Sequence, residues 1–365
     1  MPPSPSPSTG PGLPRTAKAP HLVGAHTREG ETLTSVSLPP LDLAVRARPP
    51  RREGLAPALL VHGLGGSSQN WSKLMAELDG ELDCEAVDLP GFGDSPPPPN
   101  RDYTLTGHTR AVIRYLDASR RGPVHLFGNS MGGAVATKVA AARPDLVRTL
   151  TLVSPALPEW TPQRTAVPTA LLAVPGVVDL FTRLTRHWTA EQRARSVLGL
   201  CYGDPARVTP EELALAVRES ERRLERPHFW EALAGSARGI VDSYTLLGRH
   251  SGWRLATRVK APTLLVYGGR DQLVRARNAR RAARAFGVSR TLFLPEAGHV
   301  AMMEYPELVA QAARELIHDE AELTVPASRG NPAPTVRDDG GRRDLLTEAT
   351  AHPAAKDITT DAGGS

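Results

Sequence analysis

The sequence predicts an α/β fold in which strands and helices alternate along the chain. Strand-like and helix-like segments alternate from about residue 31, a pattern typical of a sheet covered by helices. Several strand candidates are near-continuous apolar runs, as expected for strands buried on both faces. A chain of 365 residues can bury a substantial core. The alternation favours one large domain with an insertion over two ordinary domains.

Eight segments have the composition of strands, and five have the periodicity of helices. The strand candidates are Leu33 to Ser37, Asp42 to Arg46, Ala58 to Val61, Cys84 to Val87, Val124 to Phe127, Thr149 to Val153, Thr263 to Tyr267 and Thr291 to Leu294. The helix candidates are Trp71 to Leu78, Leu105 to Ala118, Met131 to Ala142, Arg275 to Phe286 and Glu307 to His318. The last of these follows Pro306, a residue favoured in the first turn of a helix.

The long interval from Pro155 to about Gly248 contains no convincing strand, only helix-like pieces separated by prolines. Its apolar run at 167–178 is shorter than the roughly 20 residues that a spanning helix needs, and prolines interrupt it. We therefore expect no integral membrane span. We expect the run to form a buried helix that offers an apolar wall to a lipophilic substrate.

Both ends of the chain are poor in large apolar side chains. Residues 1–20 are rich in proline and serine, and residues 320–365 have a similarly biased composition. Such segments cannot offset the entropy cost of ordering. We expect both to be disordered tails without a role in catalysis.

Charge and cysteine content restrict the classes of partner and compartment. The formal charge is +5, but the 44 basic and 39 acidic residues are scattered, with no basic stripe among aromatics, so we expect no nucleic-acid partner. Cys84 and Cys201 are far apart and read as two buried free thiols. The N-terminus lacks the features of a signal peptide, which favours a cytoplasmic location. Scattered histidines and the lack of a nucleotide-binding loop predict no metal and no cofactor.

The segment Gly128-Asn129-Ser130-Met131-Gly132 lies between the apolar run 124–127 and the small-residue helical stretch 133–140. A G-x-S-x-G sequence between a strand and a helix is the pattern of a nucleophile elbow. The glycines tolerate a strained turn and let the helix pack close to the strand. We interpret Ser130 as a nucleophile; the alternative is a structural turn serine.

A serine hydroxyl needs a base and an acid that orients the base. The base candidate is His299, in the loop after the last strand, and the acid candidate is Asp271, which follows the strand 262–267. The order Ser, Asp, His is that of the α/β-hydrolase arrangement. The alternatives are a histidine that caps a nearby carbonyl and an aspartate that pairs with Arg270 or Arg275.

The oxyanion of an acyl-transfer intermediate needs two hydrogen-bond donors. One candidate is the backbone N–H of Met131, directly after the nucleophile, and the second is that of Leu64, between glycines after the strand 57–61. We read His62 at the start of this loop as structural. The residues expected to contact substrate are Gly63, Asn129 and Val300.

Five segments together resemble signature segments of the α/β-hydrolase superfamily. They are 62–65 (His-Gly-Leu-Gly), 88–95 (Asp-Leu-Pro-Gly-Phe-Gly-Asp-Ser), 128–133 (Gly-Asn-Ser-Met-Gly-Gly), 268–271 (Gly-Gly-Arg-Asp) and 298–299 (Gly-His). The resemblance covers roughly residues 30 to 318. It implies a mostly parallel eight-stranded sheet with helices on both faces and a helical cap inserted after strand six. The expected core is then 21–155 with 249–319, and the expected cap is 156–248.

The sequence thus predicts a serine hydrolase without a cofactor that cleaves a lipophilic or small aromatic carboxylic ester through an acyl-enzyme on Ser130. One alternative is a carbon–carbon bond hydrolase, because the elbow is similar to that of meta-cleavage-product hydrolases. Against it, the segment after His299 lacks the tryptophan that usually follows their histidine. A non-catalytic ligand-binding protein with this fold is the other alternative. The sequence makes no prediction of oligomeric state.

Overall fold

The structure is a computed structural model that describes residues 27–159, 163–245 and 251–324. Its centre is a sheet of eight strands in the order β1-β2-β4-β3-β5-β6-β7-β8. The strands are β1 (Thr32–Leu38), β2 (Leu41–Ala47), β3 (Ala56–Val61), β4 (Leu82–Val87), β5 (Val124–Asn129), β6 (Val147–Val153), β7 (Thr263–Gly268) and β8 (Ser289–Leu294). Neighbours from β4 to β8 pair in parallel, whereas β2 is antiparallel to both β1 and β4.

Each predicted strand lies inside one of these eight, so the predicted fold class is confirmed. Strands β5 and β7 are buried along their whole length, as their largely apolar sequences predict for strands covered on both faces. The helices are α1 (Ser72–Glu77), α2 (Leu105–Ser119), α3 (Met131–Ala142), α4 (Val167–Leu171), α5 (Val177–Leu184), α6 (Ala190–Cys201), α7 (Pro210–Glu225), α8 (Phe229–Thr245), α9 (Gly252–Ala256), α10 (Asn278–Ala285), α11 (Ala301–Glu304) and α12 (Pro306–Thr324).

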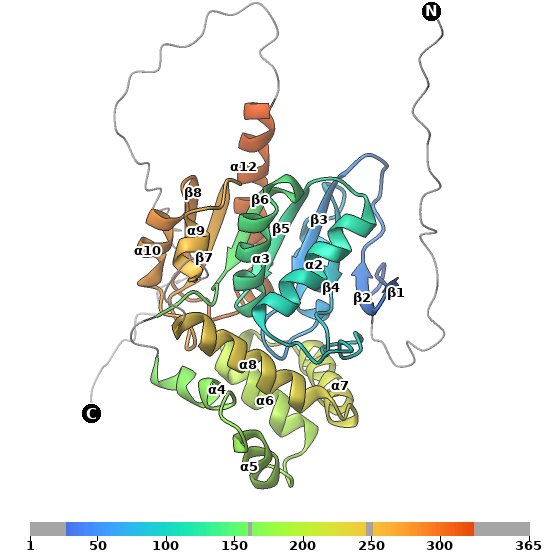
Figure 1. Cartoon of the computed structure of the whole chain (residues 1–365), viewed down its shortest axis with the longest axis vertical. Helices are drawn as coiled ribbons and strands as arrows, with labels where there is room; N and C mark the ends of the chain where they lie inside the picture. Colours follow the sequence, from blue (N-terminus) through green and yellow to red (C-terminus); the bar gives the residue numbers. More distant parts are fainter. Residues whose placement is uncertain (1–26, 160–162, 246–250, 325–365) are drawn as a thin grey trace, which may run out of the picture.

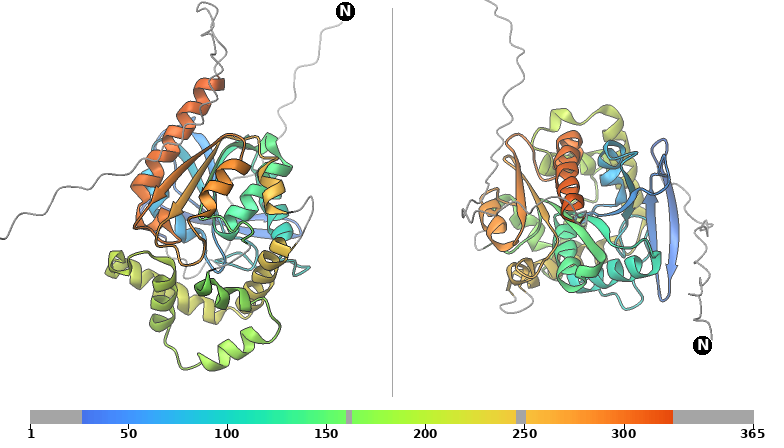
Figure 2. Two further views of the ribbon diagram at one scale, coloured as in Figure 1. Left: turned by 90° about the vertical axis from the view of Figure 1, so that its left-hand side faces the viewer. Right: turned by 90° about the horizontal axis from the view of Figure 1, so that it is seen from above.

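Helices cover both faces of the sheet and bury a separate apolar cluster on each (Figure 1). On one face, α2, α3, α9 and α10 contribute side chains such as Val112, Val135 and Leu255. On the other, α1, α11 and α12 contribute side chains such as Leu74 and Val309. Figure 2 shows the same layers from two further directions. Together the helices leave the carboxyl ends of the parallel strands as the edge where a ligand can bind.

Helices α4 to α8, between β6 and β7, form a layer at one end of the sheet, and we call this layer the cap (Figure 1). Its inner helix is α8, which lies on the loops after β3 and β4. A Cβ added at Gly65 would be 3.2 Å from Leu233, and one added at Gly91 would be 2.8 Å from Ala232. The cap therefore covers the carboxyl ends of the strands.

Polar contacts join the cap to the core at widely spaced points. Asp94, in the turn after β4, pairs with Arg222 in the last turn of α7. It also pairs with Arg226, the residue directly after this helix. Lys73 of α1 pairs with Glu212 at the other end of α7. Contacts at both ends of α7 limit the freedom of the cap to move as a body.

Two sequence expectations are corrected by the structure. The run 167–178 is neither buried nor a single helix: α4 ends at Leu171, α5 begins at Val177, and Val167, Leu171 and Val174 are exposed. The Pro175-Gly176 pair separates the helices, with Gly176 at φ +80°. No described helix is long and apolar enough to cross a membrane.

The last helix continues to Thr324, beyond the residue at which the C-terminal tail was expected to begin. Charged residues in its last turns are tied to the sheet, because Asp319 pairs with Arg290 of β8 and Glu320 lies 3.8 Å from Arg148 of β6. These ion pairs support the extra turn. The predicted N-terminal tail and the rest of the C-terminal one lie outside the described residues.

Besides His299, three histidines are buried in the described chain, and burial keeps each of these three neutral. Burial lowers the pKa of His62 and His125 to about 4 and that of His108 to about 3. His125 binds Thr149 at 2.9 Å, as expected for a satisfied core histidine, and His108 of α2 binds Ser236 of α8 at 2.9 Å. Protonation would place unpaired charge in the core, so these groups link stability to pH.

We expect the free energy of unfolding to decrease as the pH falls from about 6.5 towards 4. The unfolded chain takes up protons at these histidines near pH 6.5 and the folded chain does not, which costs up to about 1.4 kcal/mol per pH unit for each. Buried Asp88, with its pKa raised to about 6, offsets part of this loss. Urea unfolding of the full chain between pH 7 and 4.5 measures the slope.

The variant His108→Gln provides the control for this measurement. It removes one of the three groups, so it lowers stability at pH 7 but makes the pH dependence shallower by one proton. A stability that is constant across this range, or an equal slope in the variant, would contradict the assignment.

Candidate active site

Ser130 lies at the sharp turn between β5 and α3, with φ +52° and ψ −116°. A residue other than glycine rarely adopts such backbone angles unless its surroundings impose them. The turn is held by its backbone, because Ser130 N–H donates to Val153 O at 3.0 Å and Ala156 N–H donates to Ser130 O at 2.9 Å. A Cβ at Gly132 would come within 2.2 Å of Val61 O. Glycine is thus required for the helix to start this close to the sheet.

Asp271 and His299 meet at the ends of β7 and β8. His299 Nδ1 lies 3.0 Å from Asp271 Oδ2 and 3.1 Å from Oδ1, and the side chains are only 5% and 1% exposed. Asp271 Oδ1 also accepts the backbone N–H groups of Leu273 at 2.8 Å and Val274 at 2.9 Å. The carboxylate is therefore fixed in place by three donors.

These contacts determine the protonation of the pair. Burial raises the pKa of Asp271, but the contact with His299 and the two backbone N–H groups outweigh it and hold that pKa below its usual value. An ionised carboxylate accepts hydrogen bonds and donates none. His299 Nδ1 must therefore carry the hydrogen, which leaves Nε2 of the neutral ring as an acceptor for a proton.

The backbone of His299 is clamped on both sides. Its N–H donates to Cys201 O, at the end of α6, over 2.7 Å. Its carbonyl accepts from Asn129 Nδ2 at 3.0 Å, and the same amide group donates to Val153 O at 3.1 Å. Asn129, expected to contact substrate, is 3% exposed. Its side-chain amide donates hydrogen bonds to both of these carbonyls. It joins the serine turn directly to the histidine loop.

Glu304 also orders the loop that contains His299. Its two carboxylate oxygens accept from Gly298 N–H at 2.7 Å and from Gly203 N–H at 2.8 Å. Gly298 precedes His299, whereas Gly203 lies just after α6 of the cap. Glu304 thus ties the loop of His299 to the segment after α6. Its connection to the cap has no signal in the sequence.

The two predicted oxyanion donors flank Ser130. Met131 is the first residue of α3, and the N–H groups of a first turn have no partner within their own helix. On the other side, a Cβ at Gly63 would lie 3.2 Å from Ser130 Cβ, so the loop that holds Leu64 runs beside the serine. Gly63, predicted to contact substrate, thus lies beside the Cβ atom of Ser130.

The remaining residues singled out in the sequence have clear positions. His62 Nε2 accepts Leu89 N–H at 2.9 Å, and its Nδ1 lies 2.7 Å from Gly63 O; the ring therefore orders this loop, as expected. Arg270, an alternative partner for Asp271, pairs with Glu296. Val300, the third expected contact residue, is 8% exposed and belongs to the core cluster around α12.

No direct hydrogen bond joins the Ser130 hydroxyl to His299 in the described part of the chain. In ligand-free enzymes such catalytic bonds are often long and shorten when substrate binds. The strained turn and the clamped histidine loop are nevertheless held to each other by Asn129, so Ser130 and His299 lie in neighbouring loops.

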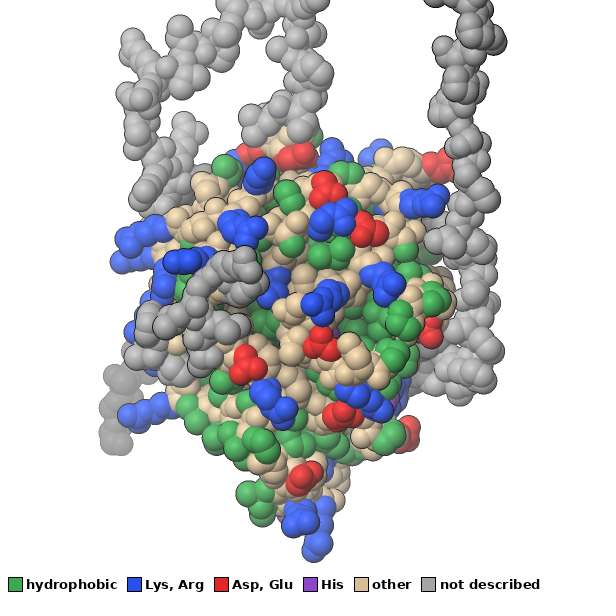
Figure 3. All heavy atoms as spheres, viewed as in Figure 1, with side chains coloured by type: hydrophobic (Ala, Val, Ile, Leu, Met, Phe, Trp, Pro, Cys, Tyr) green, Lys and Arg blue, Asp and Glu red, His purple; other side chains and the backbone are tan. Residues whose placement is uncertain are grey.

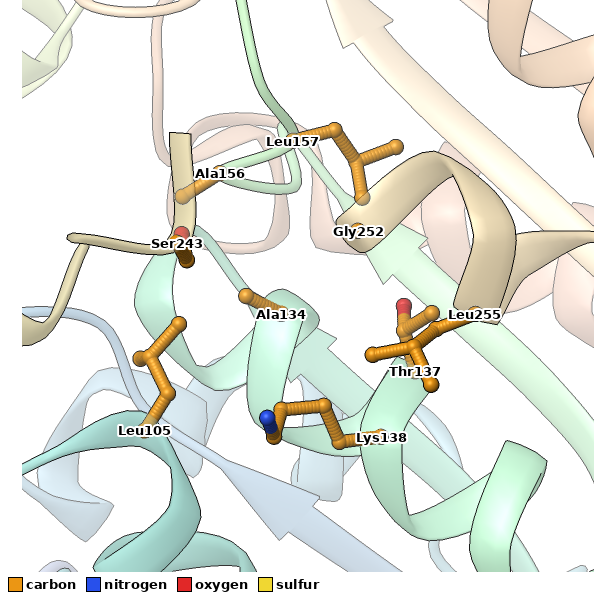
Figure 4. A pocket seen from close by; sticks show the side chains of 9 residues that line it. All are labelled: Leu105, Ala134, Thr137, Lys138, Ala156, Leu157, Ser243, Gly252 and Leu255. Atoms are coloured by element: carbon orange, nitrogen blue, oxygen red, sulfur yellow. The ribbon is translucent and has the colours of Figure 1, made fainter. Parts of the chain in front are cut away.

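A small cavity lies between α3, α8 and α9 (Figure 4). Its lining includes Ala134, Thr137, Leu157 and Leu255. The volume of about 10 Å³ is that of one water molecule. This cavity is too small for an acyl group and does not serve as a substrate pocket.

Comparison with known proteins agrees with this geometry. Residues 57–306 match the family described as alpha/beta hydrolase fold, a match that includes Ser130, Asp271 and His299. The chain belongs to the alpha/beta hydrolase family. The sequence resemblance stated above is therefore confirmed.

Two similar relatives in this family have named activities. One is the dihydrolipoyllysine-residue acetyltransferase component of the acetoin cleaving system of Pseudomonas putida, 32% identical over 269 residues, covering 71% of this chain and 62% of the relative. This chain thus spans about three fifths of that protein. The other is the pimeloyl-[acyl-carrier protein] methyl ester esterase of Neisseria meningitidis serogroup B (strain H44/76), 27% identical over 285 residues, covering 74% and 96%.

Among solved structures, 2-hydroxy-6-oxo-6-phenylhexa-2,4-dienoate hydrolase from Rhodococcus sp. strain RHA1 is similar, with a TM-score of 0.65 and 18% identity. The alignment covers 79% of this chain and 99% of that one. At this identity the likeness concerns the fold. Esterases and lipases among the sequence relatives support hydrolysis of esters at the level of the family.

We expect Asn129→Asp to destabilise the protein by about 1–3 kcal/mol. The substitution keeps the shape of the side chain but removes both donors, so two buried carbonyl oxygens lose their partner and face a carboxylate. The midpoint of urea unfolding measures the loss.

Asn100→Asp is the matched control, because exposed Asn100 uses only its Oδ1 atom, as an acceptor for Asp102 N–H at 3.2 Å, and aspartate retains that oxygen. Equal midpoints for the two variants would refute the structural role given to Asn129.

Proposed function

We propose that this protein is a serine hydrolase that cleaves carboxylic esters through an acyl-enzyme on Ser130. The observation that carries the proposal is the hydrogen bond between Asp271 and His299 Nδ1, which leaves Nε2 free to act as a base beside the serine turn. A serine at a strained strand-to-helix turn and such a histidine are the two parts that acyl transfer requires.

In the first half of the reaction, the Ser130 hydroxyl attacks the carbonyl carbon of the ester while His299 Nε2 takes its proton. Asp271 stabilises the imidazolium that forms, because its carboxylate is ionised and close. The N–H groups of Leu64 and Met131 bind the oxyanion. Collapse of the intermediate expels the alcohol, which receives the proton from His299.

In the second half, His299 Nε2 accepts a proton from water, and the resulting hydroxide attacks the acyl-enzyme. The same two N–H groups bind the second oxyanion. Its collapse returns the proton to Ser130 and releases the carboxylic acid. All of these steps use side chains and backbone groups, so the proposed reaction needs no cofactor.

The proposed substrate is an ester with a lipophilic or small aromatic group. The inner face of α8 places apolar Leu233 next to Gly65 in the oxyanion loop, which offers an apolar wall at the site. The methyl ester esterase among the relatives also acts on an ester of a carboxylic acid. We place the substrate-binding surface between α8 and the loop after β3.

We expect Ser130→Ala to lower kcat on nitrophenyl esters by about 10⁶-fold and Asp271→Asn by about 10⁴-fold. The first change removes the nucleophile, and the second leaves the imidazole in the wrong tautomer. Steady-state rates on nitrophenyl esters of graded chain length measure both effects.

A fluorophosphonate probe tests the same proposal without a known substrate. We expect it to label the wild-type protein and the control Ser196→Ala, which alters an exposed serine on α6, but not Ser130→Ala. A folded wild-type protein that resists labelling would favour a ligand-binding role. Turnover of a dienone substrate in place of esters would favour carbon–carbon hydrolysis.

A further inference from the structure

Exposed apolar side chains gather on the outermost part of the cap. In the part of the chain that the structure describes, ten large hydrophobic residues are exposed, and six of them fall within residues 167–184. These six, which we call the apolar ridge, are Val167, Leu171, Val174, Leu180, Phe181 and Leu184. An exposed apolar cluster of this kind marks an interaction surface.

The positions of these residues follow helix geometry. On α5, Leu180 and Leu184 are one turn apart and are 56% and 64% exposed, and Phe181 lies beside them. Val167 and Leu171 have the same spacing on α4, and Val174 follows three residues later in the turn after it. Figure 3 shows hydrophobic side chains beside Lys and Arg at the end of the molecule that α4 and α5 form.

The apolar ridge is separated from the active site by α8. The inner face of α8 carries Leu233, which contacts the oxyanion loop. Its outer face carries Trp230 and Arg238, which line a cavity of about 400 Å³ between α8 and residues 174–182. The ridge is thus a surface of its own and not a wall of the site at Ser130.

The charges around the apolar ridge indicate the charge of the partner that would bind it. Residues 163–188 contain three exposed arginines, Arg164, Arg183 and Arg186, and one exposed acidic residue, Asp179. None of the three arginines has an ion-pair partner in the described chain. Two copies of this surface would repel each other, whereas anionic lipid headgroups would attract it. A short helix with an apolar stripe and flanking arginines is typical of a segment that lies in a lipid–water interface.

We propose that the apolar ridge and its flanking arginines dock this protein on an anionic lipid surface. The apolar side chains enter the boundary of the acyl region, and the arginines pair with headgroup phosphates. The sheet then stays on the aqueous side, with the cap between it and the lipid. Docking uses none of Ser130, Asp271 and His299, so it is independent of the proposed reaction.

Co-sedimentation with vesicles tests the proposal, and full-length Ser130→Ala protein is used so that lipid turnover cannot interfere. We expect binding to vesicles of equal parts phosphatidylcholine and phosphatidylglycerol, and much weaker binding to phosphatidylcholine alone. Sodium chloride lowers the bound fraction because it screens the arginines. Arg183→Gln and Arg186→Gln each lower the partition by about fivefold.

The pair Leu180→Ser and Leu184→Ser lowers the partition by at least about tenfold, because both side chains lose their place in the acyl boundary. The matched control is Leu224→Ser with Val288→Ser, which alters two exposed apolar residues outside the ridge. Circular dichroism and urea unfolding confirm that both pairs remain folded.

Three outcomes would overturn the proposal. The first is equal binding of the ridge and control variants, and the second is the absence of any preference for anionic vesicles. The third is a dimer of the vesicle-free protein, seen by sedimentation velocity and abolished by the ridge substitutions. In that case the surface joins two copies of the chain.

Discussion

The contact between the Asp271 carboxylate and His299 is the interaction on which the site depends. Two backbone N–H groups bind Asp271 Oδ1, so the carboxylate has partners other than the histidine that fix its position. The ring is then bound in one orientation and one tautomer, with Nε2 available. Without this contact, the orientation of the His299 ring, the proposed base, would be undefined.

Hydrogen bonds to backbone carbonyl groups connect Asp271 and His299 to the serine turn and to the cap. Asn129 joins the serine turn to the carbonyl of His299, and the Cys201 carbonyl of α6 holds the N–H of the same residue. Gln272, next to the acid, donates to Gly199 O of α6 over 2.9 Å. The end of α6 is therefore part of the frame that positions Asp271 and His299, the proposed acid and base. The cap supports the proposed active site as well as covering it.

The sequence predicted the fold well because its strongest signals are local. Several of the eight strands are short, near-continuous apolar runs, and the elbow at Ser130 needs only a strand, a turn and a helix in succession. The frame around His299 could not be predicted in the same way. The Cys201 carbonyl belongs to the backbone, so its role does not depend on residue type and leaves no signal in the sequence. It is also nearly a hundred residues from its partner, His299.

Asn129 illustrates the same limit within a recognised motif. We expected its side chain to contact substrate. The structure shows that its amide donates to two carbonyl oxygens, that of Val153 at the end of β6 and that of His299 in the loop after β8. Buried carbonyls must be paired, and this demand arises only once three strands have been brought together.

The failed expectation for residues 167–178 has its origin in the layered construction of the cap. An apolar run becomes buried only where an apolar surface is available to receive it. The inner layer is already occupied by α8, whose Ala232 and Leu233 pack on the loops of the core. Helices α4 and α5 lie outside that layer, with an open cavity between α8 and residues 174–182, and only Val178 of the run 167–178 is buried. Burial depends on position in the fold as well as on composition, so the same residues that predict a core helix here form an exposed surface.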